Sequence, residues 1–365
     1  MISLAAVTIN SKVREYVNQA LDEGMIGQGR FIRKFEEKIK TYLNFRGVYS
    51  FFVANGTLAD AVSLASLKIL KADKNEVILP ALTFVAQANA VLMAGLKPVF
   101  VDAGDRFNMD LLKIEEKITN KTLAIMPVHL LGIPCNMDVI NEIAFRHNLF
   151  VVEDSCEALG SKWRGINTGT WGHIGTFSFF VSHTITTGEG GLIVTNDDRI
   201  ANIIKSVMNH GRLSDDPLEK FQFPYFGFNA KATNIQAAIG CALVDDIDDI
   251  IEARRKNVKY LNSKLGFDIM EDRGNEYISP HCYPVETESM GVRNEKINRL
   301  LQAGIEVRTL YNSIPNNTHF SSGEIYPNAL DYSMRYYYVP IHQNLTIDNL
   351  DYMARHIKYT LKDYE

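Results

Sequence analysis

Short apolar runs alternate with helical segments over the first 245 residues. Between residues 11 and 44, apolar residues recur at helical spacing, with a glycine-rich break at 24–29. From residue 49 onward the runs are apolar nearly throughout, so both faces of the predicted strands are expected to be covered by crossover helices. The pattern predicts a doubly wound, mostly parallel α/β sheet, which binds ligands at the carboxyl ends of its strands. The predicted strands lie at 49–53, 77–79, 98–102, 123–128 and 149–154.

The pattern changes near residue 245. Residues 234–244 are small and apolar, as in a buried helix, whereas 247–265 form a long, charged amphipathic segment. We therefore predict a large domain over residues 1–245 and a smaller C-terminal α+β domain over 246–365. In the smaller domain the predicted strands include Tyr283 and 339–340, and the predicted helices lie at 295–303 and 347–362.

Composition narrows the class of protein. Of 365 residues, 46% are hydrophobic and 22% are charged, which is typical of a globular protein. The net charge of −5 and the absence of a dense basic run argue against nucleic-acid binding. No apolar run is long enough to cross a membrane and the N-terminus lacks a secretory pattern, so we expect a cytoplasmic protein with no membrane partner. Four scattered cysteines indicate reduced thiols and no metal site.

Two motifs follow predicted strands. The segment 55–57, Asn-Gly-Thr, opens a helix, and a helix N-terminus approached by glycine favours an anion such as phosphate. The alternative is an ordinary turn with an N-cap. Asp154 ends another strand, where a carboxylate could pair with the protonated ring nitrogen of a pyridoxal cofactor. The alternative there is a solvated acid.

The stretch 177–191 is the most informative part of the chain. It reads as a buried aromatic strand, a polar turn that contains His183, and a glycine cluster. A histidine on such a turn can act as a general base near neutral pH. A structural histidine is the alternative.

Many ordered matches make the chain resemble the DegT/DnrJ/EryC1/StrS sugar aminotransferases, which are fold type I pyridoxal-phosphate enzymes. The matching segments span nearly the whole chain: 27–29, 35–36, 80–84, Asn229 and 235–240. The resemblance implies that Gly56, Thr57 and Ser178 hold the phosphate of pyridoxal 5′-phosphate or pyridoxamine 5′-phosphate. It also implies that Asp154 meets the pyridine nitrogen and that Phe84 stacks on the cofactor ring.

The resemblance further implies the partners of the chain. Asn229 matches a residue that reaches the phosphate of the neighbouring subunit's cofactor, so a homodimer with shared active sites is expected. The expected substrate is a nucleotide sugar, with glutamate as the expected amino donor.

One departure from the family pattern bears on the reaction. Ordinary members read Ser-Phe-His-x-x-Lys before the glycine cluster, and the lysine forms a Schiff base with the cofactor. Here Phe180 and His183 occupy the histidine and lysine positions, and imidazole can remove a proton but cannot form a stable Schiff base. The chain thus resembles the NDP-4-keto-6-deoxyhexose 3-dehydratases, such as GDP-4-keto-6-deoxymannose 3-dehydratase. Glu157, where aminotransferases usually carry glutamine, agrees with that branch.

This resemblance implies C3 dehydration in deoxysugar biosynthesis for lipopolysaccharide O-antigen, with His183 as base and Asp154 and Glu157 as further catalytic residues. Some members of this branch carry an iron–sulfur cluster, and the scattered cysteines of this chain do not suit such a cluster. The glycine cluster 188–191, however, is closer in sequence to those members and to the aminotransferases than to the GDP-sugar enzyme. The identity of the nucleotide is therefore left open. Three alternatives remain: a glutamate-dependent aminotransferase that uses another lysine, an engineered histidine at the lysine position, and a catalytically silent, cofactor-binding regulator.

Overall fold

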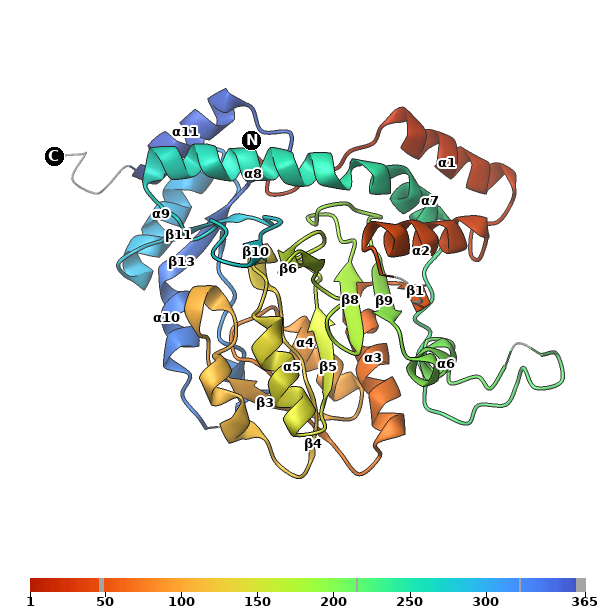
Figure 1. Ribbon diagram of the computed structural model, residues 1–365. Helices are drawn as coiled ribbons and strands as arrows, with labels where there is room; N and C mark the ends of the chain where they lie inside the picture. The colour runs from red at the N-terminus through yellow and green to blue at the C-terminus, as the bar shows by residue number, and fades with distance from the viewer. Residues whose placement is uncertain (46–48, 215, 322, 359–365) are drawn as a thin grey trace.

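A seven-stranded sheet forms the centre of the fold in the computed structural model, which describes residues 1–45, 49–214, 216–321 and 323–358 (Figure 1). The strand order is β1-β9-β8-β5-β4-β2-β3, and only β9 runs antiparallel to its neighbours among the described strands of this sheet. The mostly parallel α/β fold is therefore confirmed. The strands are β1 (Tyr49–Val53), β2 (Glu76–Pro80), β3 (Lys97–Val101), β4 (Thr122–Ile125), β5 (Phe150–Asp154), β8 (Ile174–Ser178) and β9 (Gly191–Thr195).

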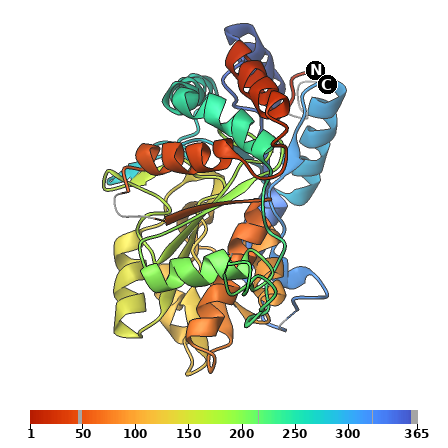
Figure 2. The ribbon, with the colours of Figure 1, turned by 90° about the vertical axis from the view of Figure 1, so that its right-hand side faces the viewer.

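Helices cover both faces of this sheet (Figure 2). Consecutive strand residues point to opposite faces, so Val151 of β5 packs in the cluster that includes α5, whereas Val152 packs with residues of α3 and α4. The helices on one face are α3 (Gly56–Leu70), α4 (Ala86–Met93) and α6 (Asp198–Val207). Those on the other are α2 (Arg30–Tyr42), α5 (Met137–Arg146) and α7 (Asn234–Leu243).

The sequence pattern located these elements to within a few residues. The expected helical region 11–44 is two helices, α1 (Ser11–Asp22) and α2, separated at the glycine-rich break. The strand expected at 123–128 already ends at Ile125, and the chain then turns through Pro127, which has no N–H for a ladder bond. The antiparallel direction of β9 was not predicted, because apolar runs do not encode strand direction.

The C-terminal elements begin with α8 (Ile247–Leu265), which runs across one end of the sheet from α7 toward α9 and α11 (Figure 1). A three-stranded sheet has the order β11-β13-β12, and a second has the order β10-β6-β7.

The proposed domain boundary at 245/246 stays a prediction, and residues 359–362 of the last predicted helix lie outside the described residues. Within the described ranges, no helix is both long and apolar enough to span a bilayer. The remaining elements are β6 (Lys162–Trp163), β7 (Ile166–Asn167), β10 (Glu276–Tyr277), β11 (Tyr283–Glu286), α9 (Met290–Gln302), β12 (Arg308–Thr309), α10 (Pro327–Arg335), β13 (Tyr336–Val339) and α11 (Ile347–Lys358).

Candidate active site

A cavity of about 710 Å³ lies where several central strands end. Segments that follow β1, β2, β5 and β8 line it, as expected for a ligand site at the carboxyl edge of a parallel sheet. Residues from β12 and β13 close another side. The cavity brings together seven of the eight site residues expected from the sequence: Gly56, Thr57, Phe84, Asp154, Glu157, Ser178 and His183.

The N-terminus of α3 opens onto one end of this cavity. The Asn55 side chain caps the helix by accepting a hydrogen bond from the backbone N–H of Leu58 at 2.9 Å. A Cβ atom on Gly56 would lie 2.9 Å from both Ser178 Cβ and Cys156 Sγ, so only glycine allows this close approach. The first backbone N–H groups of α3 are left to bind an anion, and Thr57 and Ser178 add hydroxyl groups nearby.

Asp154 lies at the carboxyl end of β5 and is almost fully buried. The Gln87 side-chain amide donates to one carboxylate oxygen, and the Cys156 N–H donates to the other at 2.9 Å. Burial raises the pKa of Asp154, and both hydrogen bonds oppose that shift. A cationic ring nitrogen at this carboxylate would offset the cost of burying the charge. Gln87 was missed, although a polar residue in the small, apolar helix α4 was a usable signal.

Asp60, on α3, is a second buried carboxyl group in the cavity wall. One of its oxygens accepts a hydrogen bond from the Thr176 hydroxyl at 2.6 Å, and its Oδ2 atom has no partner among the described residues. Burial and the charge of Asp154 raise the pKa of Asp60 well above its ordinary value. Two buried carboxyl groups favour a cationic ligand at this end of the cavity. The apolar pattern of α3 gave no reason to single out Asp60.

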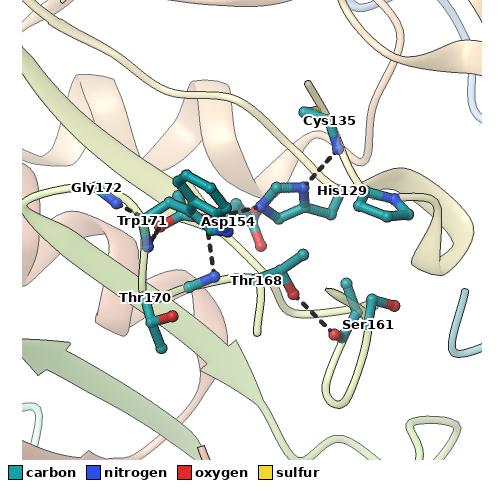
Figure 3. A network of polar contacts seen from close by, with 12 residues as sticks. His129, Cys135, Asp154, Ser161, Thr168, Thr170, Trp171 and Gly172 are labelled. Carbon is teal, nitrogen blue, oxygen red and sulfur yellow. Dashed lines mark hydrogen bonds and ion pairs between the residues drawn. The ribbon is translucent and has the colours of Figure 1, made fainter. Parts of the chain in front are cut away.

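A polar network next to Asp154 links His129 with the 169–172 loop (Figure 3). The buried Glu153 carboxylate accepts hydrogen bonds from three backbone N–H groups of the 169–172 loop at 2.6–2.8 Å. The ring of His129 lies 3.1 Å from the same carboxylate, and its Nδ1 accepts from the Cys135 N–H at 2.9 Å. His129 therefore donates from Nε2 to Glu153, which ties the loop after β4 to the end of β5.

His183 is half-buried on the loop after β8. Its backbone N–H donates to the Phe180 carbonyl at 3.1 Å, and the buried Arg254 guanidinium donates to the His183 carbonyl at 3.2 Å. Its Nδ1 atom is buried and has no partner among the described residues. Burial, His281 and Arg254, in decreasing order, lower the pKa of His183 well below its ordinary value. The imidazole is thus neutral near pH 7 and able to accept a proton.

Glu157 lines the same cavity as His183 and contacts a residue from the C-terminal part of the chain. The Tyr311 hydroxyl donates to one of its oxygens, and the Leu131 N–H donates to the other at 2.8 Å. Burial raises the pKa of Glu157, and the hydrogen bonds from Tyr311 and Leu131 oppose that shift. The ring centroids of Phe84 and Tyr311 are 5.7 Å apart, so Phe84 is held beside this carboxyl. Tyr311 was missed because only the fold brings it near Glu157.

Asn229 is the expected site residue that does not line the cavity of its own chain. Its Oδ1 accepts a hydrogen bond from Lys231 Nζ at 2.7 Å, and the same ammonium group donates to Asn209 at 3.0 Å. No lysine lines the cavity in the part of the chain that the structure describes.

Residues 7–358 match the sequence model of the DegT/DnrJ/EryC1/StrS aminotransferase family. The chain belongs to this family. Its aminotransferases and dehydratases use pyridoxal or pyridoxamine phosphate, which confirms the predicted cofactor. The cavity also fits that cofactor, because an anion site at α3 and a buried carboxylate at Asp154 lie in one cavity wall.

Relatives of the chain carry out two different reactions. The chain is 38% identical to the GDP-perosamine synthase of Caulobacter vibrioides over 341 residues, which cover 89% of each chain. It is 32% identical to the GDP-4-keto-6-deoxy-D-mannose 3-dehydratase of Yersinia pseudotuberculosis over 330 residues, or 84% of each chain. Among solved structures, the E. coli GDP-4-keto-6-deoxy-D-mannose-3-dehydratase with bound hydrated pyridoxal phosphate superposes with a TM-score of 0.88 at 28% identity, covering 98% of this chain and 99% of that one.

Proposed function

We propose that this chain removes the C3 hydroxyl group of a GDP-linked 4-keto-6-deoxyhexose with pyridoxamine phosphate as cofactor. The observation that carries the proposal is His183, a neutral imidazole in the cavity at the position of the family's Schiff-base lysine, with no lysine among the described lining residues. The names of the relatives above support a GDP-linked sugar as substrate.

The cofactor would be held by residues from four strand ends. Gly56, Thr57 and Ser178 would bind its phosphate at the N-terminus of α3, Asp154 would pair with its ring nitrogen, and Phe84 would lie against its ring. When bound, pyridoxamine phosphate supplies an amine that condenses with the C4 ketone and a protonated ring that accepts electrons.

The side chains that line the cavity hold and transfer the protons of the reaction. Asp154 keeps the ring nitrogen protonated, and His183 removes a proton from the cofactor's C4′ carbon. Glu157, whose pKa is raised by burial, would give a proton to the C3 hydroxyl, which departs as water. C3 takes up a proton, and hydrolysis leaves a 3-deoxy-4-keto sugar, ammonia and the cofactor in its aldehyde form, pyridoxal phosphate. Glutamate is the proposed donor that restores the amine of the cofactor.

Amino transfer to the sugar is the second candidate, and the comparisons favour it. Identity to a GDP-perosamine synthase is 38%, against 32% for the dehydratase. In this reaction the proton taken by His183 would be returned to the sugar at C4, and the C3 hydroxyl would stay in place. The nitrogen would then remain on the product.

The fate of nitrogen separates the two reactions. The chain would be incubated with pyridoxal phosphate, ¹⁵N-glutamate and GDP-4-keto-6-deoxymannose, without any iron–sulfur reductase, and the products analysed by mass. Dehydration gives a deoxy sugar, ¹⁵N-ammonia and 2-oxoglutarate. A ¹⁵N-amino sugar that retains its C3 hydroxyl would replace the first candidate with the second, and turnover of neither kind would favour a silent, cofactor-binding protein.

The first prediction concerns the link between cofactor and protein. Because His183 cannot form a stable Schiff base and no described lysine lines the cavity, the cofactor should be bound without a covalent bond. After borohydride treatment and denaturation, all cofactor should separate from the protein on a desalting column. A cofactor-modified lysine peptide in the mass spectrum would contradict this prediction and favour amino transfer through that lysine.

The second prediction concerns a homodimer with shared sites. Asn229 lies outside its own cavity, and the preceding segment 216–228, which projects from the body in Figure 1, exposes 80% of Phe221 and 76% of Phe226. We propose that Asn229 reaches the cofactor phosphate of a second copy. Asn229→Ala should weaken cofactor binding about tenfold, the typical effect of losing one hydrogen bond to a charged group.

Asn209→Ala is the matched control, because it removes the other side-chain partner of Lys231. Fluorescence titration with pyridoxal phosphate would compare the variants, and light scattering would give the mass of the particle. A monomer that binds cofactor as tightly as the wild-type protein would refute the shared site.

A further inference from the structure

A second imidazole, His281, lies beside His183 in the wall of the cavity. The two ring centroids are 5.1 Å apart with an angle of 39° between the planes, and the His281 side chain is 8% exposed. In both rings Nδ1 is buried and has no hydrogen-bond partner among the described residues. Leaving such an atom unpaired costs free energy, so two of them in neighbouring rings of one cavity wall point to a use for both nitrogens.

One side chain contacts the backbone of both segments that carry the pair. The guanidinium group of Arg254, on α8, donates to the carbonyl of His183 and to that of Pro280, at 3.2 Å in each case. Arg254 thus joins the loop after β8 to the segment before β11, and these two segments carry the two imidazoles.

A carboxyl group lies behind His281. Its Nε2 atom is 3.9 Å from Oε1 of Glu157, the oxygen that accepts the Tyr311 hydroxyl. His183, His281 and Glu157 therefore follow one another as a base, a second imidazole and a carboxyl group. In nucleophile and base pairs of enzymes, a third group commonly orients the base and stabilises it once it is protonated.

The charges around the pair favour a neutral His281. Arg254 and Arg308, from α8 and β12, add positive charge, whereas Glu157 adds a carboxyl group and Tyr311 and Cys282 lie nearby. Burial, Arg254 and Arg308 lower the pKa of His281 to about 3. His281 is therefore neutral at physiological pH and has a free ring nitrogen that can accept a hydrogen bond.

We propose that His281 is a positioning residue for His183, and that its neutral ring accepts a hydrogen bond from Nδ1–H of His183 once His183 has taken a proton. The proton stays on His183, and this hydrogen bond stabilises the charged form against burial and the neighbouring charges, which lower the pKa of His183. This inference rests on the proposed role of His183 as base. It applies to either reaction proposed above, because both require His183 to take up one proton.

The test compares His281→Phe, which keeps a buried ring without nitrogen atoms, with His281→Gln, which keeps a hydrogen-bond acceptor. ¹⁵N-histidine NMR of the full chain, with and without pyridoxal phosphate, would follow the titration of His183. His281→Phe should lower the pKa of His183 further and slow turnover about 10- to 100-fold, as expected for one hydrogen bond to a charged group. His281→Gln should recover part of both losses. His342→Phe, at another buried histidine near Arg254 that does not line the cavity, should leave both values unchanged.

An unchanged or raised pKa of His183 in the His281→Phe protein would overturn the proposal. If His281 only repelled charge or only filled space, its replacement by phenylalanine would raise the pKa of His183 or leave it unchanged. If the phenylalanine variant does not fold, a normal His183 pKa and rate in His281→Ala or a complete loss in His281→Gln would also overturn it. Failure of the proposed function looks different: His183→Asn would then keep its rate, whatever the His281 variants do.

Discussion

Replacing His183 by asparagine is expected to abolish most removal of the C3 hydroxyl while the fold and cofactor binding persist. The side-chain Nδ1 atom has no partner among the described residues, so the substitution breaks no hydrogen bond at that atom. Loss of a general base typically slows a reaction about 10²- to 10⁴-fold. Single-turnover analysis of the deoxy sugar would measure the rate, and cofactor absorbance would verify binding.

His147→Asn is a suitable control, because it makes the same change at an exposed histidine that pairs with Glu115. It should leave turnover unchanged. If His183→Asn still removes the C3 hydroxyl at nearly the original rate, His183 is structural and another group is the base.

His183→Lys tests the same position in the opposite direction. A lysine there could bind the cofactor covalently and return the proton to sugar C4, so elimination should fall and some amino sugar should form. Glu157 would remain beside the substrate, and the change of reaction should therefore be partial. The lysine variant should become trappable by borohydride. A covalent adduct with an undiminished deoxy-sugar yield would show that the residue at this position does not select the reaction.

Replacing Asp154 by asparagine is expected to have the second large effect, a loss of about 10²- to 10³-fold in turnover, by analogy with removal of one preorganised electrostatic group. The amide cannot hold the ring nitrogen in its protonated form. Cofactor absorbance as a function of pH should show the ring nitrogen losing its proton at a lower pH than in the wild-type protein. An unchanged titration would mean that Asp154 does not face the ring.

The same substitution should make the cofactor-free protein more stable at neutral pH. Burial raises the pKa of Asp154 above its value in the unfolded chain. The stability that this group contributes is therefore full below the unfolded pKa and is lost as pH rises through the folded pKa. Asparagine does not titrate and so loses no stability in this way. The thermal unfolding temperature of the variant should therefore exceed that of the wild-type protein by an amount that grows from about pH 4 toward neutrality. Asp60 remains in both proteins, and its pKa should be lower in the variant because the charge of Asp154 no longer raises it.

The apolar pattern determined the positions of most strands and helices, because burial on both faces of a parallel sheet requires continuous apolar runs. It also located Asp154 and the 55–57 motif at strand ends, where such sheets bind ligands. The lysine-to-histidine departure at residue 183 could be seen in the sequence alone, because it is a change of residue type within a recognised motif.

Only the tertiary structure decided which distant residues complete the site. Gln87 and Asp60 reach Asp154 from two helices, and His281 approaches His183 across about a hundred residues of sequence. Local periodicity does not report such long-range contacts, because they depend on how sheet, helices and C-terminal segments pack together. The pKa shifts of His183 and Glu157 likewise follow from burial and neighbouring groups, and these exist only in the folded chain.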